Sequence, residues 1–445
     1  MTRPLSHFYS MHMAVVDLSA GTAEVLPVPE DLIRNSMGGA SANLDLLDQY
    51  RKEDPLVLGV GPLTGTFAPA SALMAATFIS PKTKRPTHTP VLRSAGADLK
   101  FSGLSFVVIK GRSPGPQALF ISQGRTRLFP ADDLTGLQTT AAWKALRRKI
   151  PDFSGSILLT GCVADQKSPL AALSVDLGGG WDKNGMALWM QARNLKAILL
   201  SGTGRLPVSE DQMAHARVLR GRMDARLPSG ERVCLAVLRK IDPTFNPGAL
   251  RPNMMRKDLA CYHCPFPCIS FVGADREKGK GFVLFDHMGF LALTRKSGSL
   301  APGLMRLCLD LGLDPAAAAT CLSGDETMEQ ASEVLLKLVS GEDSLRRQAR
   351  VHAEPSKGYE QVFGGGIPAV PTDSGEQGSE GWAKRVAAAM ILGICPLVML
   401  LFSVIDEKMW IRFLCDQQEG VLSLQKRLEL TIDKVVSREN PGTLH

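Results

Sequence analysis

Three cysteines lie close together in the run Cys261-Tyr262-His263-Cys264-Pro265-Phe266-Pro267-Cys268. The spacing C-x2-C-x3-C lets three thiols converge on one metal centre, so the fold must bring a fourth ligand to this loop from elsewhere in the chain. Thiolate sets of this kind hold either a tetrahedral zinc ion or an iron-sulfur cluster, and the spacing alone does not distinguish the two.

The length and composition indicate a globular protein of two or three domains. The chain has 445 residues, 44% of them hydrophobic, which is enough to bury a large core. Nine cysteines and a start without an apolar signal core predict a reducing, cytoplasmic location. Lys and Arg give a net charge of +7 but are scattered along the chain. This pattern argues against nucleic acid as a partner and favours an acidic electron-carrier protein.

One apolar segment is long enough to cross a bilayer as a helix. Val386 to Ile405 runs for twenty residues without a charge. Gly393, Cys395 and Pro396 lie at its centre, and a proline tends to divide one helix into two. We therefore expect two buried helices that meet at a metal site, with a membrane span as the alternative.

The chain changes from strand-rich to helix-rich patterning near residue 205. Short apolar runs bounded by turn residues predict strands in the first part. These runs are Met13–Leu18, Ala23–Leu26, Leu56–Val60, Ser105–Lys110, Ala118–Ser122, Ile157–Thr160 and Ala197–Leu200. Apolar residues spaced three and four apart predict helices over Gln212–Ala225 and Glu329–Val339, and a charged helix is expected over Leu422–Val436. The predicted fold class is α+β.

These patterns divide the chain into four segments. Residues 1–205 are predicted to form a β-rich domain, and residues 206–353 a helical domain that carries the cysteine loop. Residues 354–381 are rich in Pro, Gly and Ser and predict a connection. Residues 382–445 are predicted to form a C-terminal helical segment that supplies the fourth cysteine, Cys395.

Several motifs resemble those of the tungsten-containing aldehyde ferredoxin oxidoreductases, in the order and spacing of that family. They are Asp54–Thr66 (DPLVLGVGPLTGT), Asp98–Gly103 (DLKFSG), Asn194–Ile198 (NLKAI), the three-cysteine run, Leu311–Asp314 (LGLD) and Leu392–Cys395 (LGIC). The resemblance implies an N-terminal β-rich domain that cradles a bis-pterin tungsten cofactor, followed by mostly α-helical domains that close over it. It also implies that Cys261, Cys264, Cys268 and Cys395 bind a [4Fe-4S] cluster.

The chain departs from the family pattern where the tungstopterin would bind. A polyanionic cofactor needs Arg or Lys, glycines and carboxylates around it. At the family's cofactor positions only Lys183, Gly185, Gly312 and Asp314 are matched, the first two in part. Family arginines, glycines and acidic residues are replaced by Gly38–Ser41, Leu73, Pro90–Arg93, Val283, Phe285, Leu309 and Met390. The region before Gly381 is too short for the segment that carries the family's active-site histidine, so we assign no catalytic residue.

Reasoning from the cysteines alone leaves zinc and a [4Fe-4S] cluster as alternatives, with the apolar flanks of the loop suited to shield a cluster. Cys162, Cys234, Cys308, Cys321 and Cys415 show no ligand spacing and are expected in the core. We expect His263 to face solvent and Asp286-His287 not to form an acid-base pair. Asp314 is expected either to bind the cofactor or to cap the helix that begins at Pro315.

Three functions follow as alternatives. The first is a [4Fe-4S] electron-transfer subunit of an oxidoreductase complex that has lost the tungstopterin. Its partners would be other redox subunits, such as a catalytic paralogue, or a ferredoxin-like carrier. The second is an active tungsten or molybdenum enzyme that acts on an aldehyde or a carboxyl-level substrate. The third is a zinc-stabilised structural protein.

Overall fold

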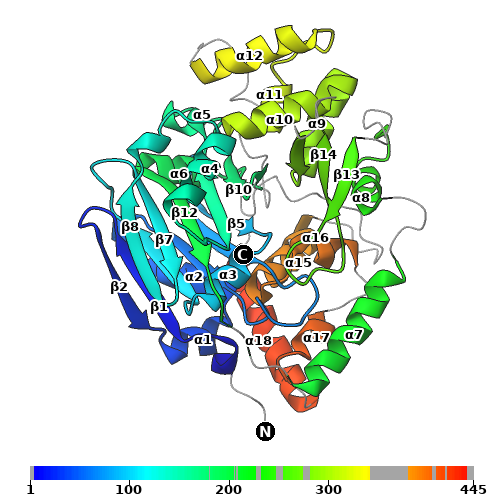
Figure 1. Cartoon of the computed structure of the whole chain (residues 1–445). Coiled ribbons are helices and arrows are strands. Elements are labelled where there is room, and N and C mark those ends of the chain that lie inside the picture. The colour runs from blue at the N-terminus through cyan, green and yellow to red at the C-terminus, as the bar shows by residue number, and fades with distance from the viewer. Residues whose placement is uncertain are drawn as a thin grey trace.

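Two β-sheets and the helices between them form the N-terminal part of the protein, and helices form most of the remainder (Figure 1). The computed structural model describes residues 5–179, 181–204, 206, 209–226, 232–246, 254–273, 281–340, 379–402, 407–415 and 418–437. The expected connection at 354–381 therefore lies, up to residue 378, outside the described residues.

The first sheet has six strands in the order β2-β1-β6-β3-β4-β5. Its strands are β1 (His12–Asp17), β2 (Thr22–Pro27), β3 (Leu56–Val60), β4 (Met74–Ile79), β5 (Pro86–Val91) and β6 (Phe106–Lys110). β1 and β6 are parallel, and the other neighbours are antiparallel. The turn from β1 to β2 forms because the Asp17 carboxylate accepts hydrogen bonds from the backbone N–H groups of Ser19 and Ala20.

The second sheet has nine strands in the order β13-β14-β15-β11-β10-β9-β12-β7-β8. Its strands are β7 (Gln117–Ser122), β8 (Arg125–Pro130), β9 (Ser156–Thr160), β10 (Leu173–Val175), β11 (Gly178–Gly179), β12 (Leu195–Ser201), β13 (Met255–Leu259), β14 (Ile269–Gly273) and β15 (Gly281–Leu284). One parallel pair, Gly178 with Val283, joins the last three strands to the rest. The sheet therefore draws strands from both halves of the chain.

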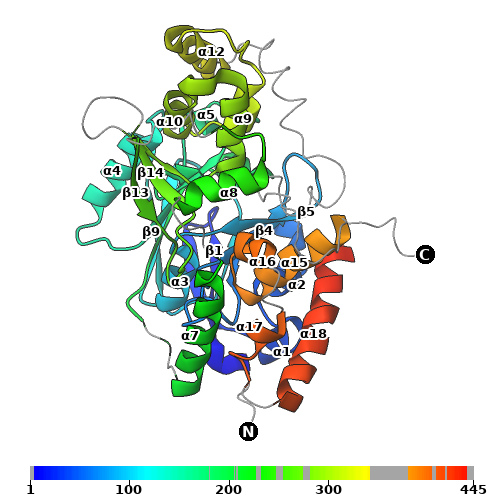
Figure 2. The same ribbon diagram turned by 90° about the vertical axis from the view of Figure 1, so that its right-hand side faces the viewer.

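Helices cover the sheets and build the C-terminal part (Figures 1 and 2). They are α1 (Glu30–Ser36), α2 (Gly39–Gln49), α3 (Ala95–Phe101), α4 (Thr139–Lys149), α5 (Cys162–Asp165), α6 (Met186–Ala192), α7 (Glu210–Asp224), α8 (Val233–Ile241), α9 (His287–Ser297), α10 (Ala301–Leu311), α11 (Pro315–Ala319), α12 (Met328–Ser340), α15 (Ser379–Leu392), α16 (Pro396–Leu401), α17 (Glu407–Ile411) and α18 (Gln418–Ser437). α2 packs on β3 and β4, and α15 and α18 pack on α2, so the C-terminal helices lie against the first sheet.

The predicted fold class, an α+β chain with a β-rich N-terminal part, is confirmed. The apolar segment from Val386 forms α15 and α16, separated at Gly393, Ile394 and Cys395. No helix in the described part of the chain combines the length and apolarity needed to cross a bilayer. The region after Ser209 is mostly helical, as predicted, and it also contains the strands β13, β14 and β15.

Candidate functional site: two cysteine segments and a buried ion network

The cysteine loop closes the antiparallel hairpin of β13 and β14. Inside the loop, the Cys264 N–H donates to the carbonyl of Cys261 over 3.1 Å, and His263 adopts a left-handed φ of 50°. The Tyr262 N–H donates to the carbonyl of Arg93 over 2.9 Å. This bond attaches the loop to the segment between β5 and α3, so the N-terminal part of the chain helps to set the position of the thiols.

The fourth cysteine stands between two buried helices. α15 ends at Leu392, Gly393 turns the chain with φ 88°, and Cys395 is the N-cap of α16, whose first residue is Pro396. Proline suits the first position of a helix because that position needs no N–H donor. The sequence predicts that the apolar segment divides into two helices. In the structure Cys395 lies at the point of division.

Ala70 joins the two cysteine segments through its backbone. Its N–H donates to the carbonyl of His263 over 3.3 Å, and its carbonyl accepts from the Cys395 N–H over 3.0 Å. These contacts bring the loop residues Cys261 to Cys268 and the helix break together, although about 130 residues separate them in sequence.

The thiols are close enough to influence one another. Burial raises the pKa of the Cys395 thiol to about 12, and the proximity of Cys261 adds to the effect. Burial also raises the pKa values of Cys264 and Cys268 well above the ordinary thiol value, and repulsion from the other cysteines adds to it. Four mutually repelling thiols need a positive group among them before they can all ionise.

Four thiols are a donor set for either a zinc ion or an iron-sulfur cluster. In the described part of the chain no three His, Cys, Asp or Glu side chains, the cysteines included, lie at the spacing of metal ligands. The backbone N–H groups of Val398 and Leu397 point at the Cys395 thiol and oppose the rise in its pKa. Such N–H groups stabilise thiolates and cluster sulfurs. A [4Fe-4S] cluster held here would supply one-electron chemistry; the four cysteines as its ligands remain a prediction.

Arg93 places a positive charge beside the thiols. Its backbone N–H and its guanidinium both oppose the effect of burial on the pKa of Cys261. Nη1 of Arg93 is buried and has no hydrogen-bond partner in the described part of the chain. Pro90–Arg93 stands where the aldehyde ferredoxin oxidoreductases have a glycine-containing loop. No local pattern in the sequence predicted that Arg93 would face the cysteines.

The family motifs that the chain retains hold Cys395 in place. The buried Lys100 ammonium donates to the carbonyls of Pro62 and Thr64, at 3.0 and 2.7 Å, and so fixes the loop that follows β3. The Leu63 N–H of that loop donates to the carbonyl of Leu392 over 3.0 Å. The loop motif thus supports the Leu392–Cys395 motif directly, and Lys100 supports it through the loop.

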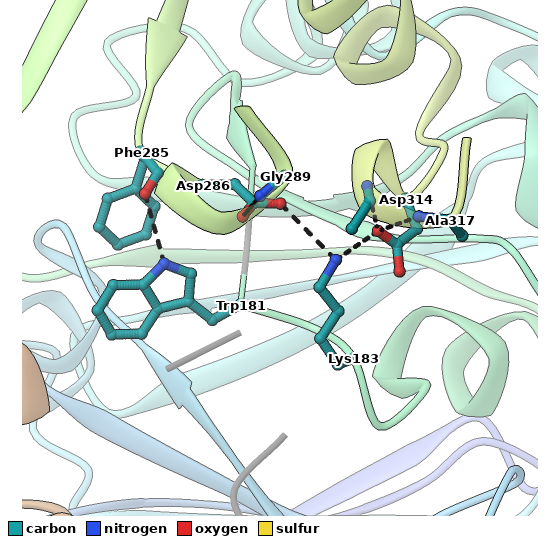
Figure 3. A network of polar contacts seen from close by, with 8 residues as sticks. Trp181, Lys183, Phe285, Asp286, Gly289, Asp314 and Ala317 are labelled. Atoms are coloured by element: carbon teal, nitrogen blue, oxygen red, sulfur yellow. Dashed lines mark hydrogen bonds and ion pairs between the residues drawn. The ribbon is translucent and has the colours of Figure 1, made fainter. Parts of the chain in front are cut away.

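The cofactor-side residues gather in a separate buried network (Figure 3). The Lys183 ammonium forms an ion pair with Asp314 and lies 3.9 Å from the nearer oxygen of Asp286. Burial favours the neutral form of Lys183, but the two carboxylates outweigh it and raise the pKa of the ammonium. Burial favours the neutral form of Asp314 as well, and the charges of Lys183 and Lys82 outweigh it and lower its pKa.

Each carboxylate of this network also caps a helix. Asp314 accepts from the backbone N–H groups of Ala316 and Ala317 at the start of α11, as one of the two predicted roles requires. Asp286 accepts from the Gly289 N–H over 2.8 Å at the start of α9 (Figure 3). Each carboxylate therefore has two structural partners, the N–H groups at the start of a helix and the Lys183 ammonium.

The start of α6, where a cofactor phosphate could bind, is already filled. Asp182 accepts from the N–H groups of Gly185, Met186 and Ala187 at 2.7 to 2.9 Å. Gly185 has a φ of 89°. A carboxylate of the chain thus occupies the donors that an anionic ligand would use.

The structure places the remaining sequence candidates as follows. Gly312, with φ 71°, ends α10 and touches Gly161 too closely to admit a side chain; its place on the cofactor side stays a prediction. Leu73, Leu309 and Met390 are buried in the core, and His263 is exposed, as expected. His287 is not paired with Asp286; its Nε2 lies 2.8 Å from the carbonyl of Cys268.

Among the other cysteines, Cys234, Cys308 and Cys415 are buried and Cys162 and Cys321 are half-buried. Cys234 lies close enough to Cys268 to raise the pKa of the Cys268 thiol slightly. This proximity was not predicted, because Cys234 belongs to α8 and has no ligand spacing to the loop.

The four cysteines are thiolate donors that suit a cluster, and the described residues on the cofactor side do not suit a polyanionic pterin. The matched motifs hold Cys395, and the two contacts that an anionic cofactor would need are already made by carboxylates of the chain. Lys183 and the start of α6 are engaged by Asp314 and Asp182.

The N-terminal part matches a known family. Residues 13–202 match the aldehyde ferredoxin oxidoreductase N-terminal domain. The tungsten-containing aldehyde ferredoxin oxidoreductase of Pyrococcus furiosus is 26% identical over 205 residues, which is 44% of this chain and 34% of that protein. That of Thermococcus kodakarensis is 27% identical over the same shares. An aliphatic sulfonate oxidoreductase, WOR-like subunit, of Pyrococcus furiosus is 23% identical over 46% of this chain and 36% of its own length.

The matched segment thus spans about a third of the length of these relatives. A solved structure, the active site complex BamBC of benzoyl coenzyme A reductase with 1,5 dienoyl-CoA, resembles nearly the whole chain. The TM-score is 0.74 with 15% identity, over 97% of this chain and 89% of that one, and at this identity the likeness shows the fold alone. The predicted resemblance to the aldehyde ferredoxin oxidoreductases is therefore confirmed, at low identity, for residues 13–202, which are similar to the N-terminal domain of that family.

Proposed function

We propose that this chain is a [4Fe-4S] electron-transfer subunit of an oxidoreductase complex and that it has lost the tungstopterin site of its relatives. Cys261, Cys264, Cys268 and Cys395 would bind the cluster. The observation that carries the proposal is the division between retained and lost motifs. Lys100 bonds to the loop after β3 and that loop bonds to Leu392, so three of the retained motifs support the cysteine ligand Cys395.

The lost motifs belong to the other site. Lys183, the remaining basic match on the cofactor side, is bound by Asp314 and approached by Asp286. A cofactor phosphate would have to displace a buried carboxylate from this lysine, which is costly because the carboxylate would be left without its counter-ion. The apolar Leu309 and Met390 occupy positions where the family has pterin-binding aspartates, and both are buried.

One observation favours a second function, an active tungsten or molybdenum enzyme for an aldehyde or carboxyl-level substrate. Nζ of Lys82 is buried and has no hydrogen-bond partner in the part of the chain that the structure describes. Burial lowers the pKa of this ammonium, and Asp314 and Asp182 oppose the effect. An unpartnered cation at this position would suit an anionic cofactor. One cation does not replace the arginines, glycines and carboxylates that are missing.

We further propose that the chain works with another redox subunit. Two similar proteins support this: one is the WOR-like subunit of an aliphatic sulfonate oxidoreductase, and the other is the active site complex BamBC of benzoyl coenzyme A reductase. A catalytic paralogue that carries the tungsten cofactor would be such a subunit.

Elemental analysis of anaerobically purified protein tests the proposal. We expect about four iron atoms per chain and no stoichiometric tungsten or molybdenum, as for one cluster alone. Stoichiometric tungsten or molybdenum would support the enzyme instead, and zinc without iron would support a structural protein. Growth with added tungstate and with added molybdate ensures that the absent metal was available to the cell.

A further inference from the structure

A pocket of about 380 Å³ opens beside the cysteine loop. The loop forms one wall with His263, Cys264 and Pro265. Cys264 is half-buried, whereas Cys268 and Cys395 are buried. Of the four predicted ligands, Cys264 is therefore the one that both lines this pocket and is open to solvent. An electron could therefore enter or leave the centre through Cys264 at this surface.

Helix α7 forms the opposite wall and is fixed in place. Gln212 donates to the carbonyl of Phe413 over 2.9 Å, and Nε2 of His215 lies 2.7 Å from the carbonyl of Met409. These bonds attach one face of α7 to the segment at and after α17, which lies beside it in Figure 2. The pocket wall does not depend on a partner for its position.

The adjoining face of α7 presents two arginines to the pocket. Arg217 and Arg220 line it together with Met213 and Ala216, at the spacing of a single helix face. Both guanidinium groups are exposed, and no acidic side chain lines the pocket within the described residues. Arg220 makes one exposed ion pair, 3.6 Å from Asp224, which solvent weakens. The pocket is therefore positively charged.

An exposed aromatic ring completes the surface. Phe67 is 41% exposed and lines the pocket, with its ring set edge-on to the ring of His263 at 5.1 Å. An apolar contact surrounded by charge is typical of a protein interface. A buried redox centre with one ligand at a positive, partly apolar surface favours a negatively charged carrier.

We propose that this pocket, built from α7, Phe67 and the cysteine loop, is the docking site of an acidic one-electron carrier protein. The inference rests on the proposed function, because it requires a redox centre at the cysteines. A reduced carrier docked here would give one electron to an oxidised cluster held by the cysteines. The carrier would be oxidised and the cluster reduced, with no bond formed or broken.

Stopped-flow mixing of the oxidised protein with reduced flavodoxin, an acidic flavin carrier, tests the proposal. We expect the double variant Arg217→Glu/Arg220→Glu to react about tenfold or more slowly at low ionic strength, and added salt to slow the wild type more than the variant. The rate of reduction by dithionite, a small reductant that needs no docking site, should be the same in the variant and in the wild type. The matched control is Arg125→Glu/Arg148→Glu, an equal charge change at exposed residues of β8 and α4, and its rate should equal that of the wild type.

Two results would overturn the docking site: a pocket variant that reacts as fast as the wild type, or a control variant that slows as much. Equal melting temperatures of all the variants exclude unfolding as the cause. If the wild type contains no iron and is not bleached by dithionite, the proposed function has failed and the docking site with it. If the wild type contains the cluster but the charge reversal leaves the rate of its reduction by flavodoxin unchanged, the docking site alone has failed.

Discussion

Ala70 is the residue at which the two cysteine segments meet. Its N–H and carbonyl bond to His263 and Cys395, and its φ of 59° is unusual for a residue with a side chain. The sequence gives no sign of this role, because alanine carries no chemistry and the bonds belong to its backbone. By contrast, Cys395 could be predicted from its motif and from the proline that follows it.

Cys395→Ser tests the fourth ligand. Serine keeps the size of the side chain but is a poor ligand for iron, so we expect the iron content per chain to fall to a small fraction of the wild-type value. Iron analysis and the visible absorbance of anaerobically purified protein measure the loss. Cys321→Ser, at a half-buried cysteine of no proposed role, should retain full iron. Full iron in the Cys395 variant would remove it from the ligand set.

Arg93→Met tests the charge beside the cluster. Reduction makes a cluster more negative, so a nearby guanidinium stabilises the reduced form, and its removal should lower the reduction potential. A redox titration followed by EPR measures the change, and Arg148→Met, at an exposed residue of α4, serves as the control. An unchanged potential in Arg93→Met would mean that the guanidinium does not act on the cluster.

At the scale of elements, the contact between α15 and the loop after β3 decides where Cys395 lies. A Cβ atom on Gly61 would come within 2.2 Å of the carbonyl carbon of Leu392, and one on Gly39 within 2.0 Å of the Met390 carbonyl oxygen. In both cases the obstacle is backbone, which cannot rotate away as a side chain can. Glycine at these two positions lets the helix approach.

Gly61→Ala should therefore displace the end of α15 and with it Cys395. We expect a loss of about 1 to 3 kcal/mol of stability, as for other overpacked sites, together with reduced iron. Denaturant unfolding and iron analysis measure the two effects. Gly221→Ala in α7, where no atom lies within 4 Å of the added carbon, should be neutral or slightly stabilising. A Gly61 variant with wild-type stability and iron would show that the contact can relax.

The elements themselves were only partly predictable. The seven apolar runs correspond to β1, β2, β3, β6, β7, β9 and β12. Strands such as β3, β6 and β9 are buried along nearly their whole length and therefore carry dense apolar patterns, whereas β2 is mostly exposed. β13 to β15 were missed, since Met255–Leu259 holds three charged residues and the prolines of the loop obscure the hairpin. The ion pair between Lys183 and Asp314 joins residues 131 positions apart, so no local pattern could reveal it.

At the scale of the whole molecule, the C-terminal helices close against the first sheet, and the second sheet joins both halves of the chain. α15 and α18 pack on α2, and the β13–β15 strands extend the sheet begun by β7 to β12. The site at the cysteines therefore exists only in the assembled fold. Its integrity should follow the global stability of the protein.

That stability should fall in acid, in part through His88. Burial in β5 lowers the pKa of this histidine to about 3, and its Nδ1 lies 2.8 Å from the Thr77 hydroxyl. Between pH 3 and the ordinary histidine value of about 6.5, only the unfolded chain binds the proton, so stability falls as the pH decreases, by about 1.4 kcal/mol per pH unit.

His88→Gln should remove this contribution. Relative to the wild type, the variant should therefore gain stability as the pH falls from 7 to 5, as measured by denaturant unfolding at several pH values. Asp98, whose pKa burial raises to about 6, has the opposite sign, but it is present in both proteins and cancels in the comparison. A constant stability difference across this range would contradict the prediction.

EPR of the dithionite-reduced, anaerobically purified protein tests the central claim most directly. The account predicts an iron-sulfur signal that corresponds to a single cluster per chain, absent in Cys395→Ser, with no tungsten or molybdenum signal at any stage of a redox titration. A tungsten or molybdenum signal would contradict the loss of the cofactor, and the absence of any iron-sulfur signal would contradict the electron-transfer role.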